Sequence, residues 1–144
     1  MVLSRKQKVV LVTGVFDVLH IEHIRFLEAA KREGDWLVVG IETDKRVRRI
    51  KGAGRPIYPE MIRAEQVRAI KWVDQVFVLP EKFDSYDDWL KLVKKIRPKV
   101  YAVSGGSEHL ETKQQICDLV GTKLTVVRPR NLQVSTTLLL EKLK

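Results

Sequence analysis

Apolar residues in this chain alternate between short continuous runs and helical spacing. Val9–Val12 and Trp36–Ile41 are continuous runs, which are typical of strands buried on both faces of a parallel sheet. Between them, apolar residues recur every three or four positions from Ile21 to Ala30, and this spacing predicts a helix over residues 20–33. We expect Gly34 to end that helix in the left-handed conformation.

The same alternation of strand and helix continues along the rest of the chain. Residues 42–56 interrupt it, because a basic run followed by two glycines and a proline predicts an irregular loop there. Residues 1–8 are polar and basic, which predicts a flexible lead-in. The other expected strands cover residues 76–79, 100–103 and 123–127, and the other expected helices cover 59–70, 86–96, 112–120 and the segment from 135 onward.

Strands separated by helices throughout indicate an open, parallel, doubly wound α/β sheet, here in a single domain over residues 1–144. In such sheets ligands bind beyond the carboxyl ends of the strands, where the connections change direction. The loops at 13–23, 104–109 and 128–136 would gather at that edge. We therefore expect the functional site among these three loops.

Composition indicates in which cellular compartment the protein works. No apolar run approaches the 18 or so residues that span a bilayer, and the N-terminus lacks the apolar segment of a signal peptide, so we expect a cytoplasmic protein without membrane contact. The single Cys117 has no intramolecular disulfide partner and is expected to be a small buried residue.

The net charge of +9 suits a polyanionic partner. Nucleic acid is disfavoured, because aromatic residues are not interleaved along a basic stripe as stacking would require. The dense basic run Lys45–Lys51 fits either a solvated helix face or a ligand-binding segment, and composition leaves the two open.

The most informative stretch is residues 13–23, which read Thr-Gly-Val-Phe-Asp-Val-Leu-His-Ile-Glu-His. It predicts a buried strand, a glycine turn and a helix N-terminus, which is a natural anion site because its backbone N–H groups are unpaired. His20 and His23 are three residues apart and share a helix face. A phosphate is the favoured ligand, while zinc lacks an evident third protein ligand, so we expect no metal site built from side chains.

These residues resemble the G-x-F-D-x-x-H-x-G-H signature of the cytidylyltransferase-like nucleotidyltransferases. Residues 71–76 (Lys-Trp-Val-Asp-Gln-Val) resemble the family's R-Y-V-D-x-V segment, and residues 130–137 (Arg-Asn-Leu-Gln-Val-Ser-Thr-Thr) resemble its R-T-x-G-I-S-T-T loop. Residues 43–56 look most like the adenylyltransferase domain of ADP-heptose synthases, and glycerol-phosphate cytidylyltransferases match that stretch less well. The fold expected is then a Rossmann-like doubly wound parallel sheet of about five strands with helices on both faces.

The resemblance implies a role for each matching position. The two signature histidines contact the nucleotide phosphates and stabilise the transition state, and Lys51 adds positive charge. The signature aspartate, Asp17, holds the turn together, and Arg63 meets the acceptor phosphate. The implied nucleotide-binding residues are Thr13, Gly14, Val15, Phe16, Arg130, Ser135 and Thr136, the last two at the β- and γ-phosphates. From the residues alone, Lys51 and Arg63 also fit solvated charges, and Ser135 also fits a helix N-cap.

The expected reaction has a physical reason to use such residues. A phosphate oxygen attacks the α-phosphorus of a nucleoside triphosphate in line and expels pyrophosphate. Because the attacker is already an anion near neutral pH, the protein needs positive charge and hydrogen-bond donors more than a general base. Mg²⁺ is expected as a cofactor bound through the nucleotide phosphates.

Three positions depart from the family pattern. Glu22 replaces the glycine between the histidines, Gln133 replaces the glycine of the last signature, and Ser104–Ser107 replace a Lys-Gly-Gly-Asp type loop. We expect AMP transfer from ATP onto a phosphorylated small molecule such as a sugar phosphate. The alternatives are a CTP-dependent enzyme acting on a polyol or amino-alcohol phosphate, an FMN adenylyltransferase, or a nucleotide-binding domain without turnover. Homodimers are common in the family.

Overall fold

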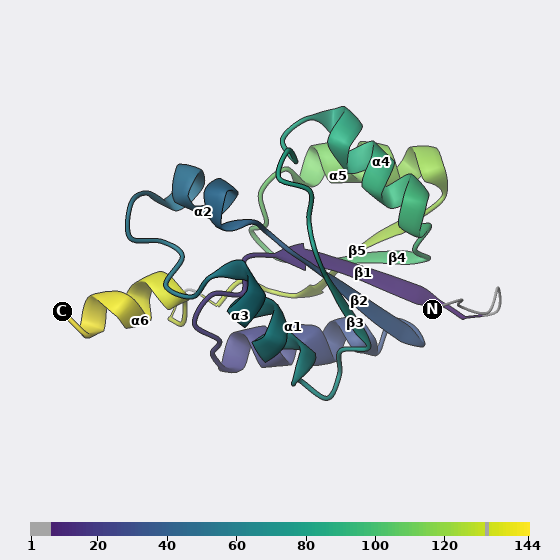
Figure 1. Ribbon diagram of the computed structural model, residues 1–144. Helices are drawn as coiled ribbons and strands as arrows, with labels where there is room; N and C mark the ends of the chain where they lie inside the picture. The colour runs from purple at the N-terminus through teal and green to yellow at the C-terminus, as the bar shows by residue number, and fades with distance from the viewer. Residues whose placement is uncertain (1–6, 132) are drawn as a thin grey trace.

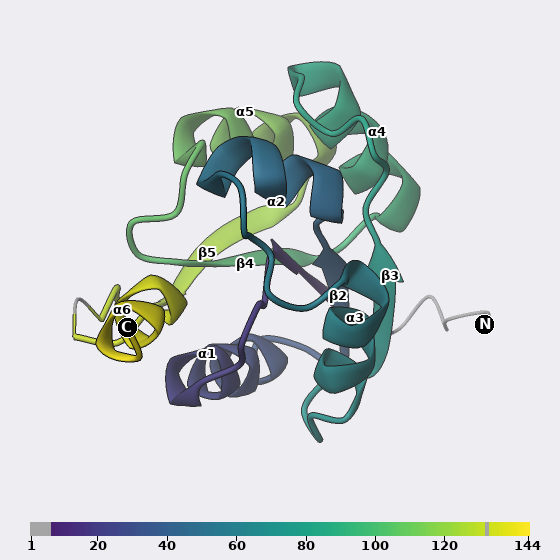
Figure 2. The same cartoon turned by 60° about the vertical axis from the view of Figure 1, so that its left-hand side comes forward.

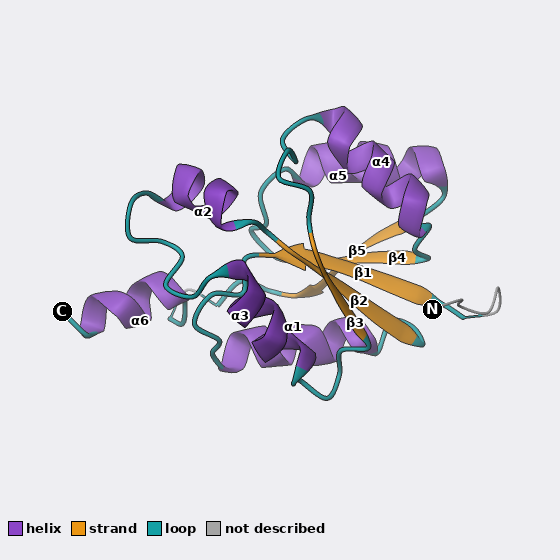
Figure 3. Ribbon diagram, in the orientation of Figure 1, coloured by secondary structure: helices purple, strands orange, loops and turns teal. Residues whose placement is uncertain are grey.

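The five strands in the described part of the chain form one all-parallel sheet in the order β3-β2-β1-β4-β5 (Figures 1 and 3). The structure is a computed structural model that describes residues 7–131 and 133–144. It confirms the predicted fold class. The elements are β1 (Val9–Gly14), α1 (Ile21–Lys31), β2 (Trp36–Ile41), α2 (Asp44–Lys51), α3 (Glu60–Arg68), β3 (Gln75–Val78), α4 (Tyr86–Ile96), β4 (Val100–Ser104), α5 (Leu110–Val120), β5 (Lys123–Arg128) and α6 (Thr136–Lys142).

Helices cover both faces of the sheet, with α1 and α3 on one side and α4 and α5 on the other (Figure 1). The central strand β1 contributes to both cores. Val10 and Val12 pack with residues of α1 and α3, whereas Leu11 packs with Trp89 and Tyr101 on the α4–α5 side. All three strand side chains are fully buried, and each such burial stabilises the fold by about 1.5–3 kcal/mol. This double burial explains why the run is apolar without alternation.

The prediction of an irregular loop over residues 42–56 is wrong for its first half, where the basic run forms α2. The hydroxyl of Thr43 accepts a hydrogen bond from the Arg46 N–H and caps the N-terminus, and Gly52, with φ of 94°, follows the last turn. Only one apolar side chain of α2, Val47, is buried, so the segment shows no apolar periodicity.

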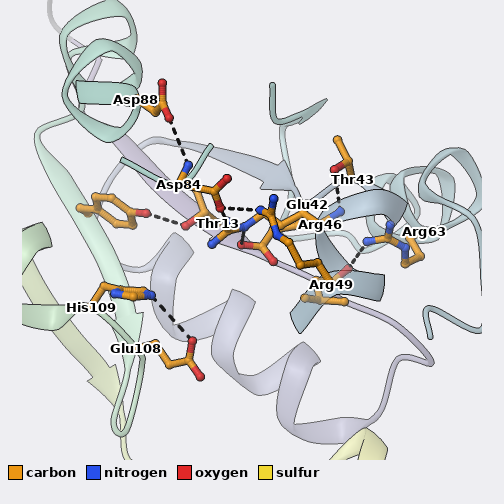
Figure 4. Close-up of polar contacts among 12 residues, drawn as sticks. Thr13, Glu42, Thr43, Arg46, Arg49, Arg63, Asp84, Asp88, Glu108 and His109 are labelled. Carbon is orange, nitrogen blue, oxygen red and sulfur yellow. Dashed lines mark hydrogen bonds and ion pairs between the residues drawn. The ribbon is translucent and has the colours of Figure 1, made fainter. Parts of the chain in front are cut away.

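The basic run of α2 is largely paired with acidic residues. Arg46 is buried and bonds the carboxylates of Glu42, at 3.2 Å, and Asp84 (Figure 4). Arg49 also bonds Asp84, at 2.6 Å. These pairs hold α2 near the start of α4, so this part of the run has a structural role.

Gly34 does not cap α1 in the left-handed conformation, which corrects the prediction. The C-cap residue of the helix is Arg32, which has the right-handed conformation. A Cβ at Gly34 would lie 2.5 Å from the carbonyl oxygen of Lys8, so glycine is required by close backbone approach. That carbonyl accepts from the N–H groups of Asp35 and Trp36, so Lys8 is held in place. The lead-in prediction is therefore wrong for Lys8, and residues 1–6 lie outside the described residues.

The connections change direction between β1 and β4, which are neighbours in the sheet. The loops that follow these two strands meet the N-terminus of α6 at the same edge (Figure 2). This is the edge at which the sequence places the site.

Candidate active site

A cavity of about 340 Å³ lies at the carboxyl ends of β1 and β4. Nine of the predicted site residues line it: Thr13, Gly14, Val15, Phe16, His20, His23, Lys51, Ser135 and Thr136. Arg130 instead lines an adjoining cavity of about 610 Å³, which shares Glu22, Lys51 and Ser135 with the first. Arg63 is absent from the lining of both cavities.

The two histidines form the N-terminal cap of α1. The Nδ1 atom of His20 accepts a hydrogen bond from the Glu22 N–H at 3.2 Å, and Nδ1 of His23 accepts from the His20 N–H at 3.1 Å. Their rings stack with centroids 3.9 Å apart. Because a neutral imidazole with an accepting Nδ1 carries its proton on Nε2, the backbone sets both rings as Nε2–H donors.

Burial lowers the pKa of both histidines. It is the main cause at His20, where the charge of Glu22 opposes it. At His23 burial and the neighbouring His20 lower the pKa to about 4, against the opposing charge of Asp17. In the free protein at pH 7 the pair therefore supplies two neutral N–H donors.

Asp17 ties the loop after β1 to the segment before α3. Its buried carboxylate accepts from the N–H groups of Ile57 at 2.7 Å and Tyr58 at 3.0 Å. Arg55 Nε lies 3.5 Å from the same carboxylate, and the Arg55 side chain lines the first cavity. The geometry gives Asp17 a positioning role that brings an additional cation into the site.

Arg63 is fully buried and its guanidinium bonds to other parts of the protein, one of these bonds being drawn in Figure 4. Its guanidinium donates to the carbonyl oxygens of Tyr58 at 2.9 Å and Val15 at 2.8 Å, and to Asp44 Oδ1 at 2.8 Å. In the structure, Arg63 therefore does not lie where an acceptor phosphate could reach it, although the resemblance implied that contact. It is not a solvated surface charge either, because it is fully buried. Arg63 joins the loop after β1, the segment before α3 and the first turn of α2, because each of its three guanidinium nitrogens donates to a different segment.

Glu22, which replaces the family's glycine, is held by cations. Arg128 Nε lies 2.7 Å from its carboxylate, Arg25 NH1 lies 3.1 Å away, and the Asn131 amide donates to it at 3.3 Å. The hydrogen bond from Arg128 is the main cause that lowers the pKa of Glu22 to about 2. The ion pair joins the first turn of α1 to the end of β5, and Glu22 borders both cavities.

The Ser-Thr pair at the start of α6 has internal partners. The Ser135 hydroxyl accepts from the Leu138 N–H at 3.1 Å and is a helix N-cap that also lines the cavity. The Thr136 hydroxyl donates to the Asp17 carbonyl at 2.7 Å. α6 is thereby attached to the loop that carries the histidines.

Among the polar residues of the first cavity, sequence reasoning missed Arg55, Lys113 and Thr137. Arg55 lies in the segment of glycines and proline for which the sequence predicts an irregular loop, and Thr137 follows the Ser-Thr pair. Lys113 gave no signal, because a lysine in an ordinary helical pattern is usually solvated. Cys117 is buried as expected, and burial raises the pKa of its thiol to about 11. Within residues 7–131 and 133–144, no group of three His, Cys, Asp or Glu residues could hold a metal ion.

Comparison with known proteins identifies the family. The family model described as Cytidylyltransferase-like matches residues 11–142. The chain is 40% identical over 108 residues to the bifunctional protein HldE of Citrifermentans bemidjiense, covering 75% of this chain and 21% of that protein. It is 47% identical over 101 residues to the FAD synthase of Thermococcus kodakarensis, covering 69% and 64% of the two chains. The chain thus spans about a fifth of the length of the first relative.

Solved structures agree with this assignment. A lipopolysaccharide core biosynthesis protein from Thermoplasma volcanium superposes with a TM-score of 0.67 at 29% identity, covering 85% of this chain and 95% of that one. A pantoate-beta-alanine ligase from Francisella tularensis, with a TM-score of 0.66 at 18% identity, shares the fold. None of the helices in the described residues has the length and apolar character needed to cross a bilayer. With its signature histidines at the cavity and the family model spanning nearly all of the sheet, the chain belongs to the cytidylyltransferase-like nucleotidyltransferases.

Proposed function

We propose that this protein is an adenylyltransferase that moves AMP from ATP onto a phosphorylated small molecule, such as a sugar phosphate, and releases pyrophosphate. The observation that carries the proposal is the pair of histidines fixed as Nε2–H donors at the cavity that Lys51 and Arg55 also line. Donors held in place before the reaction stabilise charge that develops at a phosphate without reorganisation during the step.

In this reaction His20 and His23 donate hydrogen bonds to non-bridging oxygens of the α-phosphate. Lys51 and Arg55 balance the negative charge of the polyphosphate. The polyphosphate in turn raises the low pKa values of the two histidines when it binds, because a nearby anion favours the protonated imidazole. Two carboxylates border the cavity, Asp17 and Glu22, and both are held by donors. Neither carboxylate is placed as a general base, which fits an attacker that is already an anion.

Magnesium enters this proposal with the nucleotide. Asp17 and Glu22 are engaged with N–H groups and cations, so the carboxylates that border the cavity do not offer a ready set of ligands. Phosphate oxygens and water would hold Mg²⁺, which prefers to keep several waters and bind through phosphates. Its chemistry there is to neutralise charge on the departing pyrophosphate.

Two lines of support favour ATP over CTP. The middle stretch, residues 43–56, resembles the adenylyltransferase domain of ADP-heptose synthases, and HldE proteins are among the relatives. The second candidate is transfer of AMP to FMN, which the 47% identity to a protein named FAD synthase favours. Both candidates use the same nucleotide and differ in the acceptor.

The test incubates the protein with Mg²⁺, each nucleoside triphosphate in turn, and a panel of sugar phosphates, polyol phosphates and FMN, and measures pyrophosphate. We expect release with ATP and a phosphorylated acceptor. Nucleotide-dependent thermal stabilisation without pyrophosphate from any pair would instead support a binding domain without turnover.

A pair of matched variants tests the role of the histidine donors. His20→Ser keeps a side-chain acceptor for the cap but removes the imidazole Nε2–H, and should lower kcat on the order of 100-fold. His109→Ser makes the same change at an exposed histidine and should leave kcat unchanged. Equal rates in the two variants would contradict the mechanism.

A further inference from the structure

Lys113 is a buried lysine that the mechanism above does not use. It lies in the first turn of α5 and is only 9% exposed. Its Nζ lies over the ring of Trp89, 4.9 Å from the centroid, and 5.7 Å from the centroid of Tyr101. The Tyr101 hydroxyl in turn meets the Thr13 hydroxyl at 2.5 Å, at the end of β1 (Figure 4). The two rings therefore hold the ammonium beside the first cavity, which Lys113 lines.

The ammonium is desolvated without an ion-pair partner in the described part of the chain. Burial lowers the pKa of Lys113, against the opposing charges of Glu42 and Glu108. The Glu42 carboxylate already accepts from Arg46 Nε at 3.2 Å, and Arg46 adds a like charge that opposes the ammonium. A desolvated lysine binds an incoming anion more strongly than a solvated lysine does, because less water has to be removed from its ammonium group.

The wall that carries Lys113 is otherwise neutral. Ser104 and Ser107, which line the cavity beside it, bond to one another, with the Ser107 hydroxyl donating to the Ser104 carbonyl at 2.7 Å. Lys113 is thus the positive charge that α5 brings to the cavity, in addition to Lys51 at the end of α2 and Arg55 after it. His20 and His23 approach the cavity from the α1 side.

This arrangement matches the needs of an in-line displacement. The entering oxygen and the departing pyrophosphate lie on opposite sides of the α-phosphorus. The histidines and the start of α6 are joined through the loop after β1, so they belong to one wall. An acceptor that attacks from the facing wall would bring its own phosphate toward Lys113.

We propose that Lys113 is an acceptor-binding residue that holds the phosphate group of the second substrate. The proposal rests on the proposed function for the identity of that substrate, but it makes a claim about anion binding that does not require turnover. It also defines the acceptor class, because a compound lacking a phosphate would leave the ammonium without a counter-charge.

The first experiment measures binding of inorganic phosphate by calorimetry, with the nucleotide site filled by the non-hydrolysable analogue α,β-methylene-ATP. Lys113→Met keeps an apolar side chain over Trp89 and Tyr101 and removes the charge. It should weaken phosphate binding on the order of 10-fold to 100-fold. Lys113→Arg should recover part of the loss, and Lys94→Met, at an exposed position of α4, should match the wild type.

The second experiment measures kinetics with whichever acceptor of the panel gives pyrophosphate. Lys113→Met should raise the KM for that acceptor by a similar factor and change the KM for the nucleotide less than 3-fold, a split that a general loss of structure would not give. Binding of the dephosphorylated acceptor should be equal in the two proteins.

The outcomes separate this proposal from the proposed function. Equal phosphate affinity in wild type and Lys113→Met, no measurable phosphate binding by the wild type, or an equal rise in both KM values would overturn the role of Lys113. A Lys113-dependent phosphate site in a protein that releases no pyrophosphate would support the site and reject the transferase function.

Discussion

Replacing His23 with glutamine should change how the stability of the protein depends on pH. In the folded protein the pKa of His23 is about 4, whereas an unfolded chain has the ordinary value of 6.5. Between these values the unfolded chain binds a proton that the folded chain does not, so the free energy of unfolding falls as pH drops through 6.5 toward 4. Over the full range from pH 6.5 to pH 4, the His23 contribution lowers the free energy of unfolding by about 3 kcal/mol. Between pH 7.5 and pH 5 it lowers the free energy of unfolding by about 2 kcal/mol.

Glutamine is a suitable replacement because it removes the titration and keeps the cap. A glutamine at the third helical position can accept from the N–H of the N-cap residue, as His23 Nδ1 does from the His20 N–H. Urea unfolding at pH 7.5 and pH 5.0, followed by the fluorescence of the three tryptophans, gives the stability of both proteins. Other titrating groups cancel in the comparison.

We expect the wild type to lose about 2 kcal/mol more than His23→Gln between the two pH values. The same loss in both proteins would refute the reasoning, since it would mean that His23 accepts a proton in the folded state as readily as in the unfolded chain. A larger loss in the variant would refute it equally.

Three further results are expected. Arg63→Met should lower the free energy of unfolding by about 3 kcal/mol, because it leaves the bonded carbonyls and Asp44 without a donor. Arg68→Met, at an exposed position, should change the free energy of unfolding by less than about 0.5 kcal/mol. Urea unfolding compares the two variants, and equal losses of stability would contradict the role of Arg63 in joining three segments. Glu22→Gln should lower the KM for nucleotide a few-fold at low salt, because Arg128 loses its counter-charge, and the difference should shrink in high salt; a KM that does not change would mean that the carboxylate lies outside the field of the phosphates. EDTA should abolish pyrophosphate release and excess Mg²⁺ should restore it, and release that persists in EDTA would reject the proposed role of magnesium.

The order of strands and helices could be predicted because burial leaves a direct trace in sequence. The run Val9–Val12 is apolar on both faces because β1 lies between two helical layers. Helix α2 left no such trace, since Val47 is its only buried apolar residue. Its signals were local: Thr43 as N-cap and Gly52 after the last turn, both of which stand in the sequence.

The site was predictable where roles follow from neighbouring residues and unpredictable where they depend on distant partners. The two histidines, three positions apart at a helix start, could be placed on one face from spacing alone. Arg63 could not be placed, because its burial depends on carbonyls of Val15 and Tyr58 that the fold brings together. The same holds for Lys113, whose environment is made by two rings from other elements.

The bond between the Thr136 hydroxyl and the Asp17 carbonyl joins residues 119 positions apart. A chain emerging from the ribosome can form the β1–β2 pairing early, but the loop that carries the histidines gains this contact only after the α6 segment has been synthesised. Nascent chains that end before residue 135 should therefore fold much of the sheet and still hold nucleotide weakly. Ligand capture in the cell would then follow synthesis of α6, so the nucleotide would stabilise the folded domain without guiding its early folding.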